Sequence, residues 1–555
     1  MSTSTPEAGG SGGSTASSGA DRRRWAGLFF VALGVAAIIV DATIVNVAVP
    51  SIIDDLGITG SEAQWVQEAY TLVFAAFLLM FGRLADRWGR RRIFVIGVVV
   101  FMAASVWCAL AGSGAELIAA RLAQGLGGAM MLPTSLSLIN ANFRGKDRAL
   151  AFAIWGSTIG GAAALGPLLG GWLTTEFSWR WAFGINIPIG IVVLAGTWIF
   201  MRESRDTHAQ RGVDVVGAVL SVVAVGLLVF GLIEGRVYGW WAMVGGDSVA
   251  GIPWPWSISP VPVAFAGAAI AAGVFVWVEA ARNRAAKPVL LDLKLLGIRS
   301  FRNGNIAAGI VSLGEFGLLF ALPLWLQNVL GYSAFDTGKI LLALALGSFV
   351  ASGFGAALTR ARGPVLVVRL GIVLEIVGVL GIGLIAAPDV SVWPVVAFLF
   401  VYGLGVGLAT AQLTGVVLHD VPVEASGQGS GIQSTTRQIG SALGIAVLGT
   451  VLFTALGQQL NSALEQVPGL PAAVREETVS GVVTTAGSII PSLAENPATA
   501  PIAAAAGEAL STATGWAAYV AAGFLVLGLL ASFSLGHPTA AISDSAATGP
   551  DAGVG

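Results

Sequence analysis

The sequence is poor in charge. Only 11% of its 555 residues are charged and the formal net charge is −2, whereas a soluble globular protein carries about 25% charged residues. So few charges cannot build a water-facing surface, and the near-zero balance gives no basis for binding a polyanion. We therefore expect neither an ordinary soluble fold nor a nucleic-acid partner.

Cysteine and histidine are also scarce. The single cysteine, Cys108, lies in an apolar run, and the three histidines are scattered along the chain. These numbers exclude a disulfide framework and offer no metal-ligand spacing. The stretch GYSAFDTGKI lacks the spacing and the Ser/Thr of a phosphate-binding loop, and no nucleophile–base set occurs. We predict that the protein is not an enzyme, holds no metal and does not use ATP directly.

Apolar residues, by contrast, make up 55% of the chain and gather in long runs. A helix needs roughly 20 apolar residues to cross a bilayer. The sequence therefore predicts an all-α integral membrane protein with fourteen transmembrane helices. The expected spans are 25–49, 64–82, 93–111, 115–138, 149–173, 180–201, 213–232, 260–281, 303–326, 335–358, 364–386, 392–418, 431–456 and 514–535.

The basic residues alternate from one side of these spans to the other. Most of the 29 lysines and arginines fall in the N-terminal tail and in the even-numbered loops, which is the pattern of cytoplasmic segments. A wrong number of spans would scramble this alternation, so it favours fourteen spans with both termini in the cytoplasm. Arginine far exceeds lysine, and alanine and glycine are abundant, which favours a GC-rich bacterium and hence a bacterial cell membrane.

The spans group into two six-helix bundles, at 25–201 and 303–535, with two inserted helices at 213–281. The tails, 1–24 and 536–555, are rich in small residues and are expected to be disordered. The extracellular segment 457–513 is too broken to span and is expected to form short surface helices. GRLADRWGRRR (82–92) and AALTRARGPVL (356–366) form a faint repeat eight spans apart. Two related halves around a central site are a transporter layout.

Two charged residues of opposite sign lie inside spans of the first bundle. Asp41 occurs in VDATIVNVAVP (40–50) and Arg121 in RLAQGLGGAM (121–130). At a rise of 1.5 Å per residue they lie about 13 and about 9 Å below the same face, so an ion pair is possible. Charges within a membrane usually line transport pathways, although a static ion pair between helices is the alternative.

Two acidic residues lie deep in the second bundle. Glu315 and Glu375 are each about 17 Å from the cytoplasmic end of their span, and no basic residue of the same or an adjacent span lies at that depth. We expect both to be unpaired. For Glu315 we favour a residue that binds and releases a proton; for Glu375 we favour a permanently protonated acid that is hydrogen-bonded to a neighbour.

Two short motifs contain glycines, one between two spans and one within the fifth span, where helices would approach each other closely. GRLADRWGRRR predicts that Asp86 caps or clamps neighbouring helix ends and that the arginines bind phospholipid headgroups or fix the topology, with topogenic charge alone as the alternative; the motif residues are Gly82, Asp86, Arg87, Gly89, Arg90 and Arg91. LGPLLGGW predicts a kinked helix that its neighbours approach closely, with simple packing as an equal alternative; its residues are Gly166, Pro167, Gly170 and Gly171.

Together these stretches resemble the fourteen-helix drug:proton antiporters of the major facilitator superfamily. VDATIVNVAVP looks like their first-helix motif, GRLADRWGRRR like motif A, RLAQGLGGAM like motif B and LGPLLGG like the antiporter motif C. Ala162 stands where motif C usually has an upstream glycine. WRWAFGINIPIG (179–190) and GIQSTTRQIGSALG (431–444) are also similar to this subfamily. The resemblance covers about residues 22–456 and 514–535.

The resemblance implies a rocker-switch exporter driven by the proton-motive force, with no other cofactor. Its proton coupling would involve Asp41, Arg121 and Glu315, and its substrate cavity Asn46, Gln124 and Glu315. Motif A would form a cytoplasmic gate that locks one conformation, and Glu375 would lie on an outer helix. The implied partners are small lipophilic substrates, a cationic charge being one option, together with protons and membrane lipids. A lipid or natural-product exporter on the same scaffold stays open, and a non-transporting membrane sensor is disfavoured because no signalling domain is attached.

Overall fold

The computed structural model describes residues 13–143, 145–205, 214–244, 248–249, 252–285, 287, 289–291, 293–421, 426–466 and 471–535. These residues are almost entirely helical, and the one sheet among them is a two-stranded hairpin. The predicted C-terminal tail, 536–555, and residues 1–12 of the N-terminal tail lie outside the described residues. Residues 13–24 were expected to be disordered, which is wrong, because they form the first turns of a helix that continues into the first span. The side chain of Asp86, predicted in the cytoplasmic gate, also lies outside the description.

The first half is built from seven helices. They are α1 (Gly13–Leu56), α2 (Gly60–Trp88), α3 (Arg90–Leu110), α4 (Gly114–Asn142), α5 (Gly145–Glu176), α6 (Arg180–Gly184) and α7 (Asn186–Phe200). The short α6 and the longer α7 together occupy the predicted sixth span. Six membrane crossings therefore account for this half.

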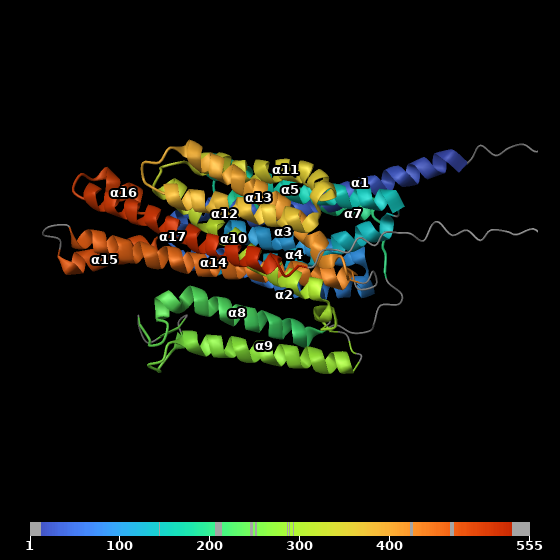
Figure 1. Cartoon of the computed structure of the whole chain (residues 1–555), viewed down its shortest axis with the longest axis horizontal. Helices are drawn as coiled ribbons and strands as arrows, with labels where there is room; N and C mark the ends of the chain where they lie inside the picture. The colour runs from blue at the N-terminus through green and yellow to red at the C-terminus, as the bar shows by residue number, and fades with distance from the viewer. Residues whose placement is uncertain are drawn as a thin grey trace, which may run out of the picture.

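The inserted pair lies along one flank of the molecule (Figure 1). It consists of α8 (Val215–Tyr238) and α9 (Pro260–Arg284), which pack against each other. Between them β1 (Ser248–Val249) pairs with β2 (Ile252–Pro253) in an antiparallel hairpin. Helix α8 also packs against α2 of the first half and α14 of the second, so the pair bridges both bundles.

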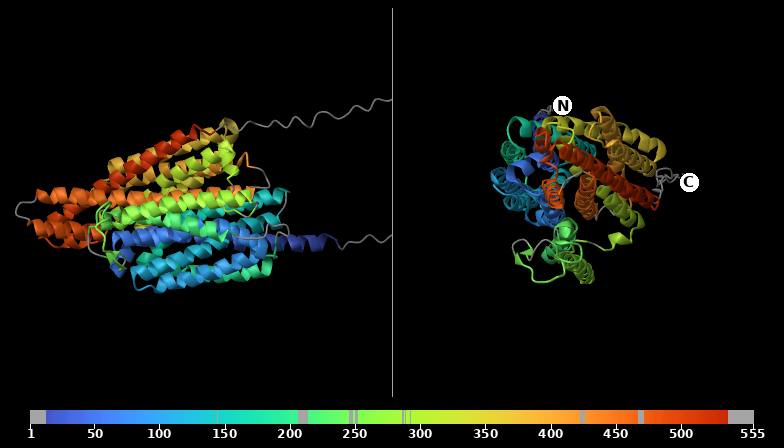
Figure 2. Two further views of the ribbon diagram at one scale, coloured as in Figure 1. Left: turned by 90° about the horizontal axis from the view of Figure 1, so that it is seen from below. Right: turned by 90° about the vertical axis from the view of Figure 1, so that its left-hand side faces the viewer.

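The second half follows a short 3-10 turn, η1 (Leu295–Gly297). Its helices are α10 (Arg299–Asn328), α11 (Ala334–Arg362), α12 (Pro364–Ile385), α13 (Val392–Leu418), α14 (Ser426–Glu465), α15 (Ala472–Thr484), α16 (Ile490–Glu495) and α17 (Ala500–Ser532). Helix α1 begins and α17 ends toward the same end of the bundle, whereas α15 and α16 lie at the opposite end (Figures 1 and 2). We call these the terminal end and the cap end.

Twelve segments of the described chain are long and apolar enough to cross a membrane. The other two expected spans are the long helices α2 and α5, which pack within the bundle, so the fourteen-span prediction is consistent with the structure. The expected spans on either side of 457–513 were too short. Helix α14 runs on to Glu465 and α17 already begins at Ala500, because Leu460, Leu464 and Ala506 pack into the same buried cluster as the cap helices.

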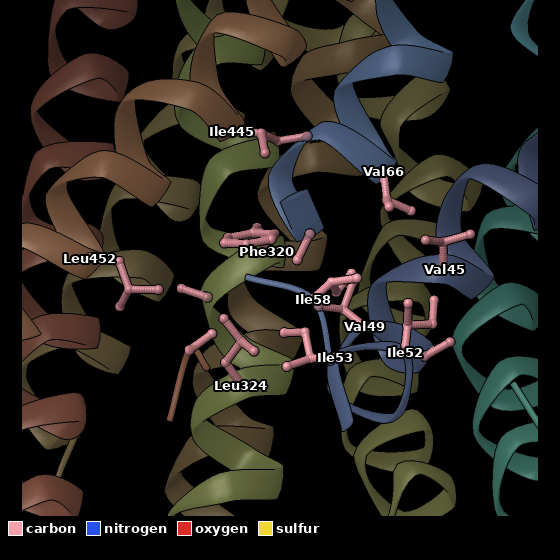
Figure 3. Packing of buried hydrophobic residues seen from close by; sticks show 14 of the residues in the cluster. Val45, Val49, Ile52, Ile53, Ile58, Val66, Phe320, Leu324, Ile445 and Leu452 are labelled. Carbon is pink, nitrogen blue, oxygen red and sulfur yellow. The ribbon is translucent and has the colours of Figure 1, made fainter. Parts of the chain in front are cut away.

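The two halves meet along two seams, α2 with α14 and α5 with α11. Near the cap end an apolar cluster from both halves fills the space between them. Figure 3 shows its centre, in which Val49 and Ile53 of α1 lie near Phe320 and Leu324 of α10. Gln327 donates a hydrogen bond to the Val47 carbonyl across the halves at 3.0 Å. This packing closes the molecule at the cap end.

The two copies of the faint repeat form the same structural corner. Gly89 ends α2 and precedes α3 with φ +117°, and Gly363 ends α11 and precedes α12 with φ +80°. Positive φ is costly for residues with a Cβ, so glycine suits both positions. The aligned glycines therefore mark equivalent tight turns in the two halves.

Candidate functional site

The predicted pair of Asp41 and Arg121 forms inside the first half. Nη1 of Arg121 on α4 lies 2.6 Å from Oδ2 of Asp41 on α1. The Asp41 side chain is 0% exposed and that of Arg121 is 2% exposed. A buried pair of this kind persists only where further hydrogen bonds satisfy both charges.

Three polar side chains complete the Asp41 network. Gln124 and Asn186 each donate a hydrogen bond to Oδ1 of Asp41 at 2.7 Å. Both also donate to the Ser105 hydroxyl, at 2.9 and 3.2 Å. Gln124 was predicted in the substrate cavity and lies in this buried network; Asn186, from α7, was not predicted. Every carboxylate oxygen of Asp41 thus has a close donor, which is how a charge is kept in a dry interior.

Arg121 is held by its backbone surroundings as well as by Asp41. Its Nε donates to the Val66 carbonyl at 3.0 Å, and its guanidinium lies 4.4 Å from the centre of the Tyr70 ring. Gly125 makes this approach possible, because a Cβ there would overlap the Tyr70 backbone of α2. The glycines after Arg121 therefore bring α4 close enough to α2 to place the guanidinium beside α1.

The prediction that Glu315 has no basic partner is wrong. Nη2 of Arg437 on α14 lies 3.5 Å from Oε2 of Glu315 on α10. The Thr410 hydroxyl of α13 donates to Oε1 of Glu315 at 3.4 Å and accepts from Arg437 at 3.4 Å. The error arose because only the same and adjacent spans were compared, whereas α10 packs directly against α14 from four spans further along.

Asn46 and Glu375 lie apart from these networks. Asn46 is partly buried and forms no hydrogen bond within the described part of the chain, so the structure does not join it to Asp41. Glu375 on α12 is 0% exposed, and neither carboxylate oxygen has a hydrogen-bond partner among the described residues. The hydrogen-bonded neighbour expected for Glu375 is therefore absent.

The predicted gate motif anchors the start of α3. The Glu203 carboxylate, which follows α7, accepts hydrogen bonds from the backbone N–H of Arg91 at 3.0 Å and of Arg92 at 3.2 Å. A carboxylate at a helix N-terminus is favourable because the free N–H groups there carry positive partial charge. The Arg90 N–H donates to the Ser204 carbonyl, and Arg87 is exposed. Gly82 packs against Pro133 of α4.

The glycines of LGPLLGGW lie at two helix crossings. A Cβ at Gly166 or Gly170 would overlap Thr43 or Ile44 of α1, and one at Gly171 would overlap the Ala334 backbone of α11. On the facing helix, a Cβ at Gly338 would overlap the Pro167 carbonyl. The predicted close approach is therefore present, and it forms the α5–α11 seam between the halves.

Comparison with known proteins bears on this arrangement of two bundles and buried charges. The family model of the Major Facilitator Superfamily matches residues 31–445. The chain belongs to the Major Facilitator Superfamily. It is 35% identical over 457 residues to "Multidrug resistance protein Stp" of Mycobacterium tuberculosis, which covers 82% of this chain and 80% of that one.

Other relatives point the same way. The chain is 34% identical over 478 residues to "Probable actinorhodin transporter" of Streptomyces coelicolor, covering 83% of this chain and 78% of the relative. A solved structure of a bacterial homologue of the lysosomal transporter Spinster, inward-facing and unoccupied, superposes with a TM-score of 0.62 over 92% of this chain and 98% of its own. At 18% identity this likeness shows the fold alone. The sequence resemblance to superfamily drug:proton antiporters is confirmed.

Sequence reasoning missed three polar residues in these helices. Asn186 lies in the stretch 179–190 that resembles the subfamily, but it carries no charge to draw attention. Arg437 lies inside the expected span 431–456, which was not compared with the span of Glu315. Glu68, fully buried on α2, lies close to the expected start of its span, where an acidic residue attracts no notice. The role of each of these residues depends on how deeply it is buried and on which helix lies beside it. Both are set by the packing of the helices.

Proposed function

We propose that this protein exports small lipophilic molecules from a bacterial cell across the cell membrane, in exchange for protons. Both termini would lie in the cytoplasm, so the cap end would face outward. The observation that carries the proposal is the buried Asp41–Arg121 pair. The titratable acid of α1 is bound there by side chains of α4 and α7. Relatives named for drug resistance and export support the class of substrate.

The pair supplies the coupling step. In the conformation described here the cap end is closed by apolar packing from both halves. An ionised Asp41 attracts Arg121 and the amide groups of Gln124 and Asn186. A proton on Asp41 removes this attraction and frees Arg121 to change partners, so the packing of α1 against α4 depends on protonation.

The second pair supplies a contact for the substrate. Arg437 is 25% exposed and Glu315 5% exposed, whereas Arg121 is 2% exposed, so a substrate between the halves would reach the second pair through Arg437. A cationic substrate would compete with Arg437 for the Glu315 carboxylate. Neutral substrates would contact apolar side chains between the halves instead. This fits the natural-product exporter as a second candidate, which the name of the actinorhodin relative favours.

The experiment is efflux of a fluorescent lipophilic cation from liposomes that hold the purified protein, with and without an imposed pH gradient. Wild type should show gradient-driven efflux, and Asp41→Asn should lose it because the amide cannot take up a proton. Glu116→Gln, which changes an exposed acid at the start of α4, is the matched control and should behave as wild type. Gradient-driven efflux retained by Asp41→Asn would refute the coupling role.

A wild type that moves no cation at all would point to the natural-product alternative. The same liposomes would then be loaded with a neutral lipophilic metabolite. Gradient-driven export of that compound, lost in Asp41→Asn, would keep proton coupling and change only the substrate class.

A further inference from the structure

Glu68 is a second buried acid in the first half, and the coupling step above does not use it. Its side chain is 0% exposed, and neither carboxylate oxygen has a hydrogen-bond partner among the described residues. An ionised carboxylate buried in this way would be very costly. In the conformation described here, Glu68 is therefore a neutral carboxylic acid.

Its neighbours along α2 place Glu68 at the seam between the halves. One turn before it, Gln64 donates to the Ile445 carbonyl of α14 at 3.3 Å. Two turns after it, the Ala75 carbonyl accepts from Thr435 of α14 at 3.4 Å. Residues one turn apart share a helix face. Glu68 thus lies on the face of α2 that meets α14.

Helix α8 covers this seam from the side. Trp65 of α2 donates to Glu234 of α8 at 2.9 Å, and Thr450 of α14 donates to the Leu232 carbonyl of α8 at 2.8 Å. The apolar residues beside the seam are Val229 and Ile233 of α8 and Ala442 and Ala446 of α14, all buried. Three helices and an apolar cluster therefore enclose the position of Glu68.

No charged group on these helices is placed to stabilise an ionised Glu68. Glu234 is itself acidic and bonded to Trp65. Arg437 lies on the opposite face of α14, where it meets Glu315. Arg121 meets the opposite face of α2, at Val66. The remaining charged residues of α2, α4, α8 and α14 lie toward the ends of these helices: Glu62, Arg83, Asp86, Arg87, Glu116, Arg236 and Glu465.

We infer that closure of the cap end takes up one proton at Glu68. When α2 and α14 separate, water reaches the carboxyl group and it ionises by giving its proton to that water. When the seam closes under α8, the carboxylate must regain a proton before it is buried. Outside acidity would thus favour the closed conformation. The use of this proton in transport rests on the proposed function. The test does not, because it measures conformation and not transport.

Glu375 provides the matched control. It too is a buried acid without a hydrogen bond, but it lies within the second half, where Gly405 of α13 packs against its backbone. No seam between halves crosses it. Glu375 should therefore stay buried and neutral in both conformations and contribute no proton to closure.

The test measures conformation rather than transport. Spin labels at Asp54→Cys and Asp389→Cys, two exposed cap-end positions on different halves, report the open and closed populations in nanodiscs. The background variant is Cys108→Ser, which removes the only native cysteine. The ratio of closed to open protein is followed over a pH series by pulsed electron spin resonance.

One proton taken up on closure changes this ratio about tenfold per pH unit. Glu68→Gln should lower the pH dependence by that amount and raise the closed fraction at high pH, and Glu375→Gln should match wild type. Glu68→Leu, suited to the apolar surroundings, is a second neutral variant if the amide prevents folding. An unchanged pH dependence in the Glu68 variants, or an equal loss in Glu375→Gln, would overturn the inference. Failed efflux with an intact pH-dependent closure would instead count against the proposed function alone.

Discussion

Among the described residues, each half has an acid–arginine pair within its membrane-spanning helices, and the two pairs are built differently. In the first half Asp41 and Arg121 approach to 2.6 Å and are 0% and 2% exposed. In the second half Glu315 and Arg437 approach to 3.5 Å and are 5% and 25% exposed. The halves share an equivalent glycine corner after α2 and after α11, so the difference is local to the pairs.

The hydrogen bonds around the pairs differ in the same direction. Gln124 and Asn186 hold Asp41 at 2.7 Å. Around the second pair the hydroxyl contacts of Ser312 and Thr410 measure 3.3 to 3.4 Å, near the limit of a hydrogen bond. The first pair is thus a closed network that can bind a proton but leaves no room for a larger ligand. The second is a loose pair that a larger ligand can separate.

The largest difference should appear when each arginine is removed. Arg121→Met leaves the Asp41 carboxylate buried without its cation, which should cost about 3–5 kcal/mol of stability. Arg437→Met breaks a wider pair with longer hydrogen bonds, but it leaves the buried Glu315 without its cation, so the loss should be smaller, about 1.5–3 kcal/mol. Thermal unfolding of the purified variants in one detergent measures both. Equal losses would mean that the two pairs are equivalent in strength, and the contrast drawn from their geometry would fall.

The second prediction concerns substrate charge. Glu315→Gln keeps the size of the side chain but removes the charge that a cationic substrate would contact. A hydrogen bond to a charged group contributes about 1.5–3 kcal/mol, so the apparent KM for a cation should rise about tenfold or more. The KM for a neutral substrate should stay near the wild-type value. A similar rise for both substrates would show that Glu315 acts on the fold or on coupling rather than on recognition.

The sequence predicted the first pair better than the second for a geometric reason. Asp41 and Arg121 each lie a few residues from the cap end of their span, so counting residues was enough to compare their depths. Glu315 and Arg437 come from α10 and α14, and only packing makes these helices neighbours. Depth follows from the sequence of one span, whereas lateral position depends on all of them.

Neutral polar residues were the hardest to predict. Asn46 and Asn186 both lie in stretches that resemble the antiporter subfamily, and the sequence favoured Asn46 for the cavity because it is close to Asp41. One turn and a half along a helix, however, turns a side chain away from its neighbour. The helical extensions of α14 and α17 were missed because neither has a strong apolar run: the end of α14, GQQLNSALE, is largely polar, and the start of α17 is rich in alanine.

The two asparagines give the finest test of the closed network. Asn186→Leu removes a donor from the Asp41 carboxylate and should cost about 1.5–3 kcal/mol of stability, together with part of the gradient-driven efflux. Asn46→Leu removes no hydrogen bond and should stay within about 0.5 kcal/mol of wild type. Thermal unfolding and liposome efflux of the two variants, which make the same chemical change, separate the cases. If Asn46→Leu is stable but loses efflux while Asn186→Leu does not, then Asn46 acts on the substrate, and coupling does not depend on the full set of donors around Asp41.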